Sequence, residues 1–114
     1  MKLRRGEIVL VNLEPVKGSE QGKKRPAVVI QNDIGNRYSP TTIIAPLTSR
    51  YEENNPAQVN LEADLETGLE QDSTVLLNQI RTVSIEHRIL KKMGRVSSEK
   101  MEKIDEALRI SLDL

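Results

Sequence analysis

Apolar residues in the first two thirds of the chain fall in short runs of strand length. The segments 7–13 (EIVLVNL), 26–31 (PAVVIQ) and 41–47 (TTIIAPL) are β-rich and are bounded by Pro, Gly and Asn. Segment 58–61 predicts a fourth short strand, and segment 73–82 (STVLLNQIRT) predicts a fifth, longer one. Five or six short strands are typical of a small β-barrel or sandwich.

The period changes from strand to helix after Gly94. Ser97 is a good N-cap, and Glu99 follows in the first turn, where a negative charge favours the helix. The residues that follow predict an amphipathic C-terminal helix with an apolar and a charged face. Its apolar face holds Met101, Ile104, Leu108 and Leu112, and its opposite face holds Glu102, Lys103, Glu106 and Arg109.

Composition limits the interactions that can stabilise this fold. A chain of 114 residues predicts a single domain over 1–114, and zero cysteine with one histidine leaves no disulfides and little for a metal site. We expect neither a metal nor another cofactor. No apolar run approaches the roughly 18 residues of a membrane span, and the start lacks a signal peptide's apolar stretch, which predicts a cytoplasmic protein. Aromatic residues make up only 2%, so the core is aliphatic and thin, and we expect a homodimer.

Charge is divided unevenly along a chain whose net charge is zero. Residues 1–50 carry nine Lys and Arg against four Asp and Glu, and residues 51–114 carry eight against thirteen, giving +5 and −5. The N-terminal half is therefore where phosphate contacts are expected.

Familiar catalytic motifs are absent from the sequence. It contains no P-loop, no G-x-G-x-x-G, no HExxH and no G-x-S-x-G. His87 stands in a polar stretch without a second histidine or a matched carboxylate, so we interpret it as a surface residue. Polar residues do gather at strand edges, but each has a plain structural explanation. Arg25 can be a surface cation, Thr48 an ordinary strand end, and the pair 32–33 a turn initiator.

Taken together, these residues resemble the MazF/PemK toxins. The resemblance is carried by R-R-G-E-I-V (4–9), L-x-P-V-x-G-S-E-Q-G-x-x-R-P (13–26), V-I-Q-N-D-x-G-N (29–36), S-P-T (39–41), L-T (47–48), L-L-N-Q-I-R-T (76–82) and E-A-L-x-I-S-L (106–112). It covers essentially the whole chain, and the block before Pro26 is quite specific.

The resemblance implies a mainly β fold, a small SH3-like barrel of the CcdB/MazF/PemK type with a C-terminal helix. It also implies a homodimeric, sequence-selective endoribonuclease that needs no metal. In this family a ribose 2′-hydroxyl attacks the adjacent phosphorus, leaving a 2′,3′-cyclic phosphate and a 5′-hydroxyl end. The partner implied is an antitoxin that lays an extended acidic segment over the RNA-binding surface.

Two catalytic residues follow from the resemblance. Arg25 matches the family's catalytic arginine, and its planar fork can hold two phosphate oxygens. Thr48 matches the catalytic threonine, whose hydroxyl would bind a phosphate oxygen or orient the 2′-hydroxyl. Several relatives have a carboxylate where this chain has Asn78, and an amide cannot accept the proton. That role then falls to another group, such as Glu20, or to water.

Recognition of single-stranded RNA requires the 2′-hydroxyl and exposed base edges. With so few aromatic residues, base recognition should depend on hydrogen bonds and arginine planes. The expected RNA-binding residues are Ser19, Glu20, Gln21, Asn32, Asn78, Gln79 and Arg81. Gln79 and Arg81 have an alternative role in the core or the dimer.

Two other functions fit the same barrel. One is a non-enzymatic toxin of the gyrase-poison type, against which the presence of both Arg25 and Thr48 argues. The other is an RNA-binding barrel without catalysis, which the asparagine at position 78 favours. RNA incubated with the protein in EDTA separates the nuclease from both alternatives, because only the nuclease yields 5′-hydroxyl fragments.

Overall fold

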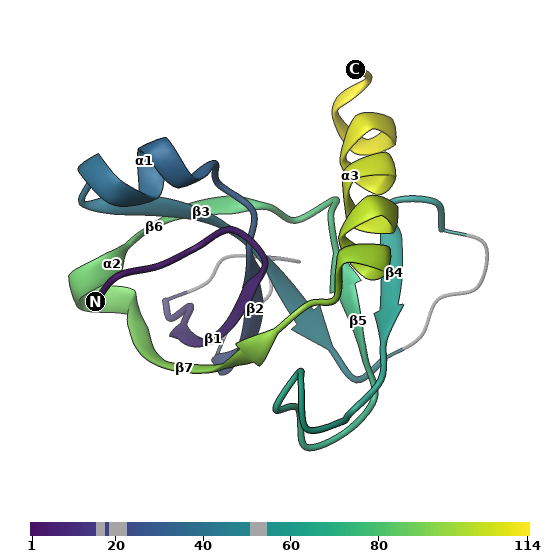
Figure 1. The fold of residues 1–114 in the computed structure, drawn as a ribbon, viewed down its shortest axis with the longest axis horizontal. Helices are drawn as coiled ribbons and strands as arrows, with labels where there is room; N and C mark the ends of the chain where they lie inside the picture. Colours follow the sequence, from purple (N-terminus) through teal and green to yellow (C-terminus); the bar gives the residue numbers. More distant parts are fainter. Residues whose placement is uncertain (16–17, 19–22, 51–54) are drawn as a thin grey trace.

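The computed structural model describes residues 1–15, 18, 23–50 and 55–114. A mainly antiparallel β-structure with a long C-terminal helix, as expected from the sequence, is confirmed (Figure 1). Among the described residues, no helix is both long and apolar enough to cross a membrane. The elements are β1 (Glu7–Asn12), β2 (Lys24–Val29), α1 (Asp33–Tyr38), β3 (Thr41–Thr48), β4 (Gln58–Leu61), β5 (Ser73–Leu76), β6 (Arg81–Ser84), α2 (Ile85–Arg88), β7 (Ile89–Arg95) and α3 (Ser98–Leu112).

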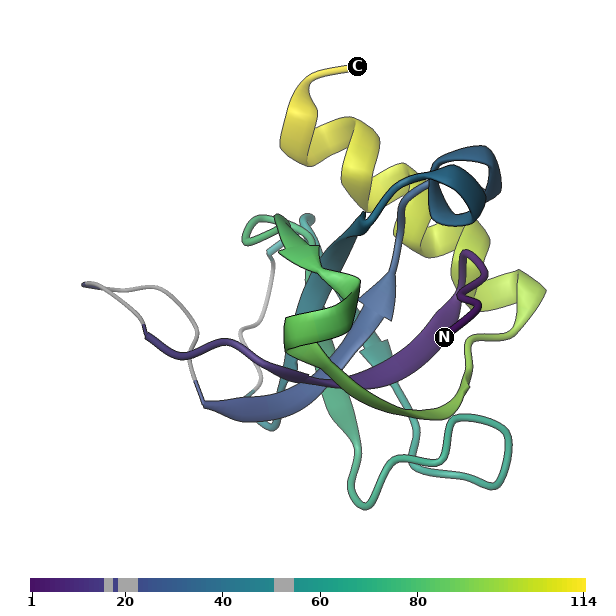
Figure 2. The same ribbon diagram turned by 90° about the vertical axis from the view of Figure 1, so that its left-hand side faces the viewer.

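The strands form one curved sheet that branches at β3. Its main path runs β4-β5-β3-β2-β1-β7, and β6 pairs with β3 beside that path. The first half of β3, Thr41–Ile44, pairs with β6, and its end, Leu47–Thr48, pairs with β5. The sheet therefore curls into a barrel-like shape without closing strictly, and α3 stands beside β4 and β5 (Figures 1 and 2).

Both faces of the central strands are buried. Ile8 and Val28 belong to one apolar cluster, which α3 also enters, whereas Val9, Val11 and Ala27 belong to a second cluster. All five side chains have 0% exposure. Because successive residues of a strand point to opposite faces, a strand buried on both sides has a continuous apolar sequence. This explains why 7–13 shows no alternation of apolar and polar residues.

The expectation of one long strand over 73–82 is wrong. The segment forms β5 and β6, separated by a turn in which the backbone N–H of Gln79 donates to the carbonyl of Leu76 at 3.1 Å. Leu77 is fully buried in the turn, whereas Asn78 is exposed. The apolar run thus continues through a change of direction, because the core, and not strand pairing, requires Leu77.

Short helix α1 was not expected from the sequence. The Asn32 side chain caps it by accepting from the backbone N–H of Gly35 at 2.8 Å. Asn36 is buried and accepts from the Thr42 hydroxyl at 2.6 Å, and its amide donates to the carbonyl of Gln31 at 2.9 Å. The pair 32–33, interpreted as a turn initiator, therefore begins a helix that buried hydrogen bonds attach to β3.

The C-terminal helix is confirmed at its expected position. Ser97 caps it by accepting from the backbone N–H of Lys100 at 3.2 Å. Ile104 and Ala107 are buried against the sheet, and the Ser111 hydroxyl donates to the carbonyl of Leu77 at 2.8 Å. Leu112, assigned to the apolar face, is 49% exposed, so the expected apolar face is only partly covered at the end of α3.

A loop over residues 62–72 connects β4 to β5 and packs against β7. Asp64 and Thr67 bond reciprocally, each backbone N–H donating to the other's side chain at 3.2 and 2.8 Å. The carbonyl of Glu66 accepts from the backbone N–H of Arg95 at 2.9 Å. A Cβ on Gly94 would lie 2.3 Å from the carbonyl oxygens of Glu66 and Thr67, so the two backbones can approach this closely only at a glycine.

Candidate active site

Strand pairing brings Arg25 and Thr48 together although they are far apart in sequence. In the β2–β3 ladder, Ala27 lies opposite Pro46. Continuing this antiparallel register by two residues places Arg25 opposite Thr48. β2 begins two residues earlier than expected, so Arg25 lies inside the strand, where Val11 of β1 is its partner on the other side. The backbone of Arg25 is therefore held by regular structure.

The Arg25 side chain is held at one end and faces the pocket. Its Nη1 donates to the carbonyl of Leu47 at 3.1 Å. Partial burial lowers the pKa of the Arg25 guanidinium below its ordinary value. An arginine remains protonated after such a shift, because its pKa begins above about 12. Arg25 is thus a fixed, partly desolvated positive charge at the end of β3.

Thr48 has a hydroxyl oriented by the chain that follows it. Its Oγ1 accepts from the backbone N–H of Arg50 at 3.2 Å. With that bond on the oxygen lone pair, the hydroxyl hydrogen can be donated to a further acceptor. Arg25 and Thr48 together therefore present donors to an anion from two adjacent strands.

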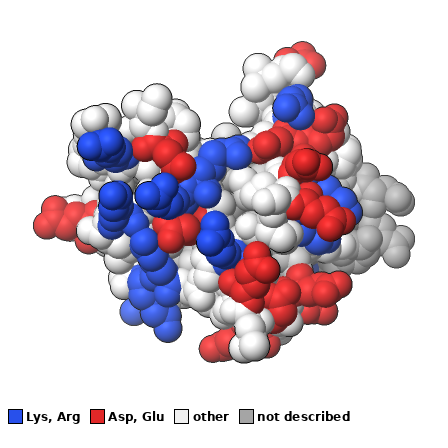
Figure 3. Space-filling view, viewed as in Figure 1, with Lys and Arg blue, Asp and Glu red and all other residues white. Residues whose placement is uncertain are grey.

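Both residues line a pocket of about 680 Å³. Five cationic side chains and two carboxylates are among its described lining residues, which makes this surface attractive to phosphate. The charged lining residues are Lys23, Lys24, Arg25, Arg50 and Lys91, with Glu14 and Glu70. Figure 3 shows the wider separation of charge, with Lys and Arg gathered at the left and Asp and Glu over α3 and the lower right.

The expected RNA-binding residues that the structure describes do not line this pocket. Asn78 and Gln79 lie in the turn between β5 and β6, and Arg81 begins β6 opposite Ile44 of β3. Asn32 uses its side-chain oxygen to cap α1. Ser19, Glu20 and Gln21 fall outside the described residues. Their roles in recognition stay predictions.

His87 lies on the surface of α2, as expected. Its side chain is 78% exposed, and its nearest charged partner is Glu86 at 3.9 Å. It does not line the pocket that holds Arg25. Across the described ranges, no three His, Cys, Asp or Glu side chains are grouped as metal ligands would be.

One side of the pocket was not recognised from the sequence. Leu69, Glu70 and Gln71 of the 62–72 loop line it, as do Lys91 and Met93 of β7. The 62–72 loop is acidic, and an acidic loop is usually solvated. Charged residues such as Lys91 and Lys92 of β7 indicate an exposed face. Gly68 and Gly94 lie where the backbones of the 62–72 loop and β7 approach each other closely. This approach is visible in the fold and not in the sequence.

The sequence pattern of the PemK-like, MazF-like toxins of type II toxin-antitoxin systems matches residues 4–112. The chain belongs to this toxin family. Bacillus subtilis (strain 168) has a relative in the PemK/MazF family, the endoribonuclease EndoA, which is 47% identical over 115 residues, covering 100% of the chain and 97% of the relative.

Solved structures of PemK/MazF-family proteins share the fold. MazF from Deinococcus radiodurans (form I) matches with a TM-score of 0.83 at 24% identity, covering 100% of this chain and 99% of that one. A mycobacterial endoribonuclease in complex with its cognate antitoxin matches with a TM-score of 0.80 at 21% identity, covering 98% and 96%. The expected fold class, the MazF-like barrel with a C-terminal helix, is confirmed.

Proposed function

We propose that the chain cleaves single-stranded RNA at selected sequences without a metal, and that Arg25 and Thr48 carry the reaction. That the chain is a toxin endoribonuclease follows from its family and from its near-full-length identity to EndoA. The observation that best supports the proposed site is the shared pocket, in which a fixed guanidinium and an oriented hydroxyl lie on neighbouring strands among further cations.

Cleavage in this proposal needs no nucleophile from the protein. The ribose 2′-oxygen attacks the adjacent phosphorus, the bond from phosphorus to the 5′-oxygen breaks, and a 2′,3′-cyclic phosphate and a 5′-hydroxyl result. The 2′-proton passes to water, and the leaving 5′-oxygen takes up a proton from water. Arg25 neutralises the charge that grows on the phosphoryl oxygens, and Thr48 donates its hydroxyl hydrogen to one of them. Both donors are fixed before the substrate arrives, which is the arrangement that lowers a barrier most.

Base recognition is assigned to the expected readers outside the pocket. Amide and guanidinium donors for the bases come from Asn32, Asn78, Gln79 and Arg81. Ser19, Glu20 and Gln21 are the other expected readers. The side-chain oxygen of Asn32 already accepts a hydrogen bond from the backbone N–H of Gly35 in α1. The side-chain N–H₂ of Asn32 is therefore the group suited to bind a base. Single-stranded RNA is the substrate because both the 2′-hydroxyl and the base edges must be accessible.

Cleavage should survive complete chelation. We expect the rate in excess EDTA to equal the rate in magnesium, because the donors that neutralise the phosphoryl charge are protein groups. The measurement is cleavage of a short RNA, with the 5′-hydroxyl ends verified by labelling with polynucleotide kinase. Loss of activity in EDTA with recovery in magnesium would contradict the mechanism, and intact RNA in both conditions would favour a non-enzymatic toxin or an inactive binder.

We propose further that the protein is a homodimer and that the end of α3 takes part in the contact. Ile110, Leu112 and Leu114 are exposed there, and Ile34 on α1 is 76% exposed. α1 and the last turns of α3 both project from the same side of the sheet (Figure 1). Exposed apolar groups of this size favour burial against a second copy.

Ile110→Glu should shift the dimer toward monomer, because the new carboxylate would lie in an apolar contact. Sedimentation at micromolar concentration measures the effect. Leu65→Glu is the matched control, since Leu65 is fully exposed in the 62–72 loop, away from α1 and α3. A parent protein that sediments as a 12.9 kDa monomer and still cleaves RNA would refute the dimer.

The antitoxin partner and the compartment complete the proposal. Solved relatives from a mycobacterium and from D. radiodurans are complexes with antitoxins. An extended acidic segment laid over the cation-lined pocket would compete directly with RNA phosphates. The cytoplasm is the compartment in which both messenger RNA and such a partner are available.

A further inference from the structure

The pocket that holds Arg25 and Thr48 is much larger than one phosphate requires. Its volume of about 680 Å³ lies within the range of pockets that enclose whole small molecules. Arg25 and Thr48 line it from β2 and β3. Other lining residues come from β1, β7 and the 62–72 loop, and the cleavage mechanism leaves this part unused.

This remaining part is lined by both apolar and polar side chains. Its apolar residues, called the apolar floor below, are Leu10, Pro26, Leu69 and Met93, and its polar residues include Lys91 and Gln71. Strand register supports the grouping, because Leu10 of β1 lies opposite Pro26 of β2 on one side and opposite Lys91 of β7 on the other.

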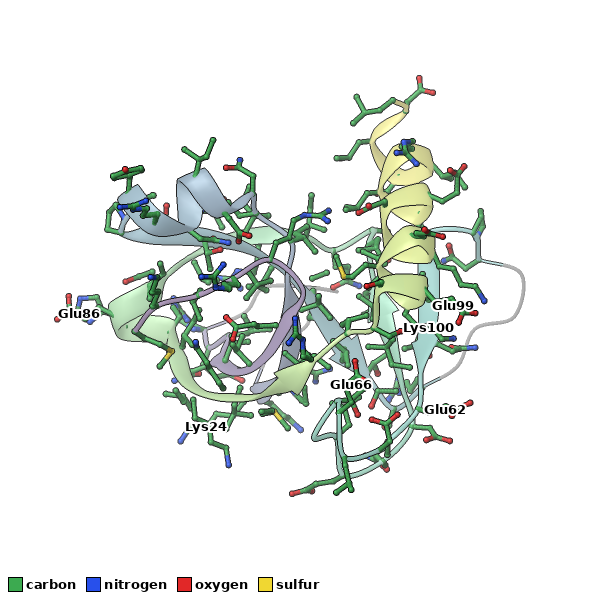
Figure 4. All side chains as sticks on the ribbon, in the orientation of Figure 1. Lys24, Glu62, Glu66, Glu86, Glu99 and Lys100 are labelled. Carbon is green, nitrogen blue, oxygen red and sulfur yellow. The ribbon has the colours of Figure 1, made fainter. Side chains whose placement is uncertain are left out.

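The wall provided by the 62–72 loop is built in place. Leu69 is only 7% exposed, and its backbone N–H donates to the Thr67 hydroxyl at 3.3 Å. The backbone N–H of Ala63 donates to the Asp72 carboxylate at 2.8 Å, which ties the two ends of the loop together. In Figure 4 the labelled Glu66 of the loop and Lys24 of β2 both lie along the lower side of the molecule. Gln71 is thus presented from a fixed backbone.

From these features we infer that this part of the pocket is a subsite for the nucleotide adjoining the cleaved phosphate, and that the 62–72 loop sets a base preference there. The inference rests on the proposed function. A nucleobase has two apolar faces and a polar edge, which match the apolar floor and the Gln71 amide. Lys91 contacts the next phosphate along the strand. This part of the pocket is continuous with the Arg25 site, so one RNA strand can occupy both. A nucleotide is therefore a better candidate than an unrelated small molecule.

The test compares the parent with Gln71→Ala and Lys91→Ala on RNA randomised on both sides of the cleavage site. Gln71→Ala should weaken base discrimination about tenfold at one position next to the cut and leave other positions unchanged. Lys91→Ala should reduce the dependence of log affinity on log salt by about 0.7, the value for one phosphate contact on a single strand. Neither residue packs in a core, so both variants should fold; thermal melting verifies this.

Two controls and a binding measurement make the result decisive. Lys103→Ala on α3 removes the same charge far from the pocket, and Leu65→Ala changes an exposed side chain of the same loop. Unchanged preference in Gln71→Ala, or equal salt effects in Lys91→Ala and Lys103→Ala, would overturn the subsite. If the parent cleaves no RNA, the proposed function fails, and the subsite is then judged on affinity for a 2′-deoxy oligonucleotide. Affinity that neither variant lowers would overturn it there as well.

Discussion

Arg25→Ala should slow RNA cleavage by at least a hundred- to thousandfold. Removing a preorganised donor from a site of developing charge typically costs about 2.7–4 kcal/mol in the barrier. Arg25→Lys should recover little, because an ammonium cannot reproduce the two parallel bonds of the guanidinium fork. It would also lose the geometry of the bond to the Leu47 carbonyl. Single-turnover cleavage at saturating protein measures the chemical step apart from binding.

The accompanying variants define what the site requires. Thr48→Ala should be slow and Thr48→Ser should keep appreciable activity, since the role asks only for a hydroxyl. His87→Ala should be nearly neutral, because the imidazole is exposed and outside the pocket. If Arg25→Ala cleaves at the parent rate, or if His87→Ala is the impaired variant, the active site lies elsewhere.

Gly94→Ala should be strongly destabilising. The new Cβ would lie 2.3 Å from the carbonyl oxygens of Glu66 and Thr67, and two backbones cannot yield as side chains do. Overpacking typically costs about 1–3 kcal/mol, and we expect the upper end or more. For a domain of this size that corresponds to a fall in Tm of about 10 °C or more. Thermal denaturation followed by circular dichroism measures it.

Gly35→Ala is the matched control for this substitution. Its Cβ would lie 2.9 Å from Cδ of Gln31, a side chain that can shift by giving up the bonds its amide donates to Asn36 and to the carbonyl of Thr41. We expect a smaller loss in the free energy of unfolding than for Gly94→Ala, about 1 kcal/mol. Equal losses of stability in the two variants would show that the backbone contact between the 62–72 loop and β7 is no less tolerant of an added methyl group than the contact at Gly35.

The fold could be predicted from the sequence wherever one signal dominated. The run 7–13 and the period after Ser97 predicted β1 and α3, because strand runs and helical spacing are local properties. Prediction was wrong over 73–82, where Leu77 continues the apolar run through a turn. It missed α1, whose six residues include Gly35 and Asn36 and carry no amphipathic pattern.

The candidate site was accessible to sequence reasoning only through the family resemblance. Nothing local connects Arg25 with Thr48, because a ladder between two strands brings them together. The wall formed by Leu69 and Gln71 was missed for the same reason, since its place beside β7 depends on contacts across the fold. Resemblance transfers the residues that relatives share, whereas a loop's position must be seen in three dimensions.

Charge is divided in space among the described residues, with α3 and the 62–72 loop acidic and the region near β1, β2 and β7 basic (Figure 3). This separation of cations from carboxylates gives the molecule an electric dipole moment although its net charge is zero. Such a dipole experiences a torque near a polyanion, which turns the basic side forward before contact. The protein therefore meets RNA in a preferred orientation. Added salt weakens this orienting effect by screening charges that lie more than a Debye length apart, even though the molecule as a whole is neutral.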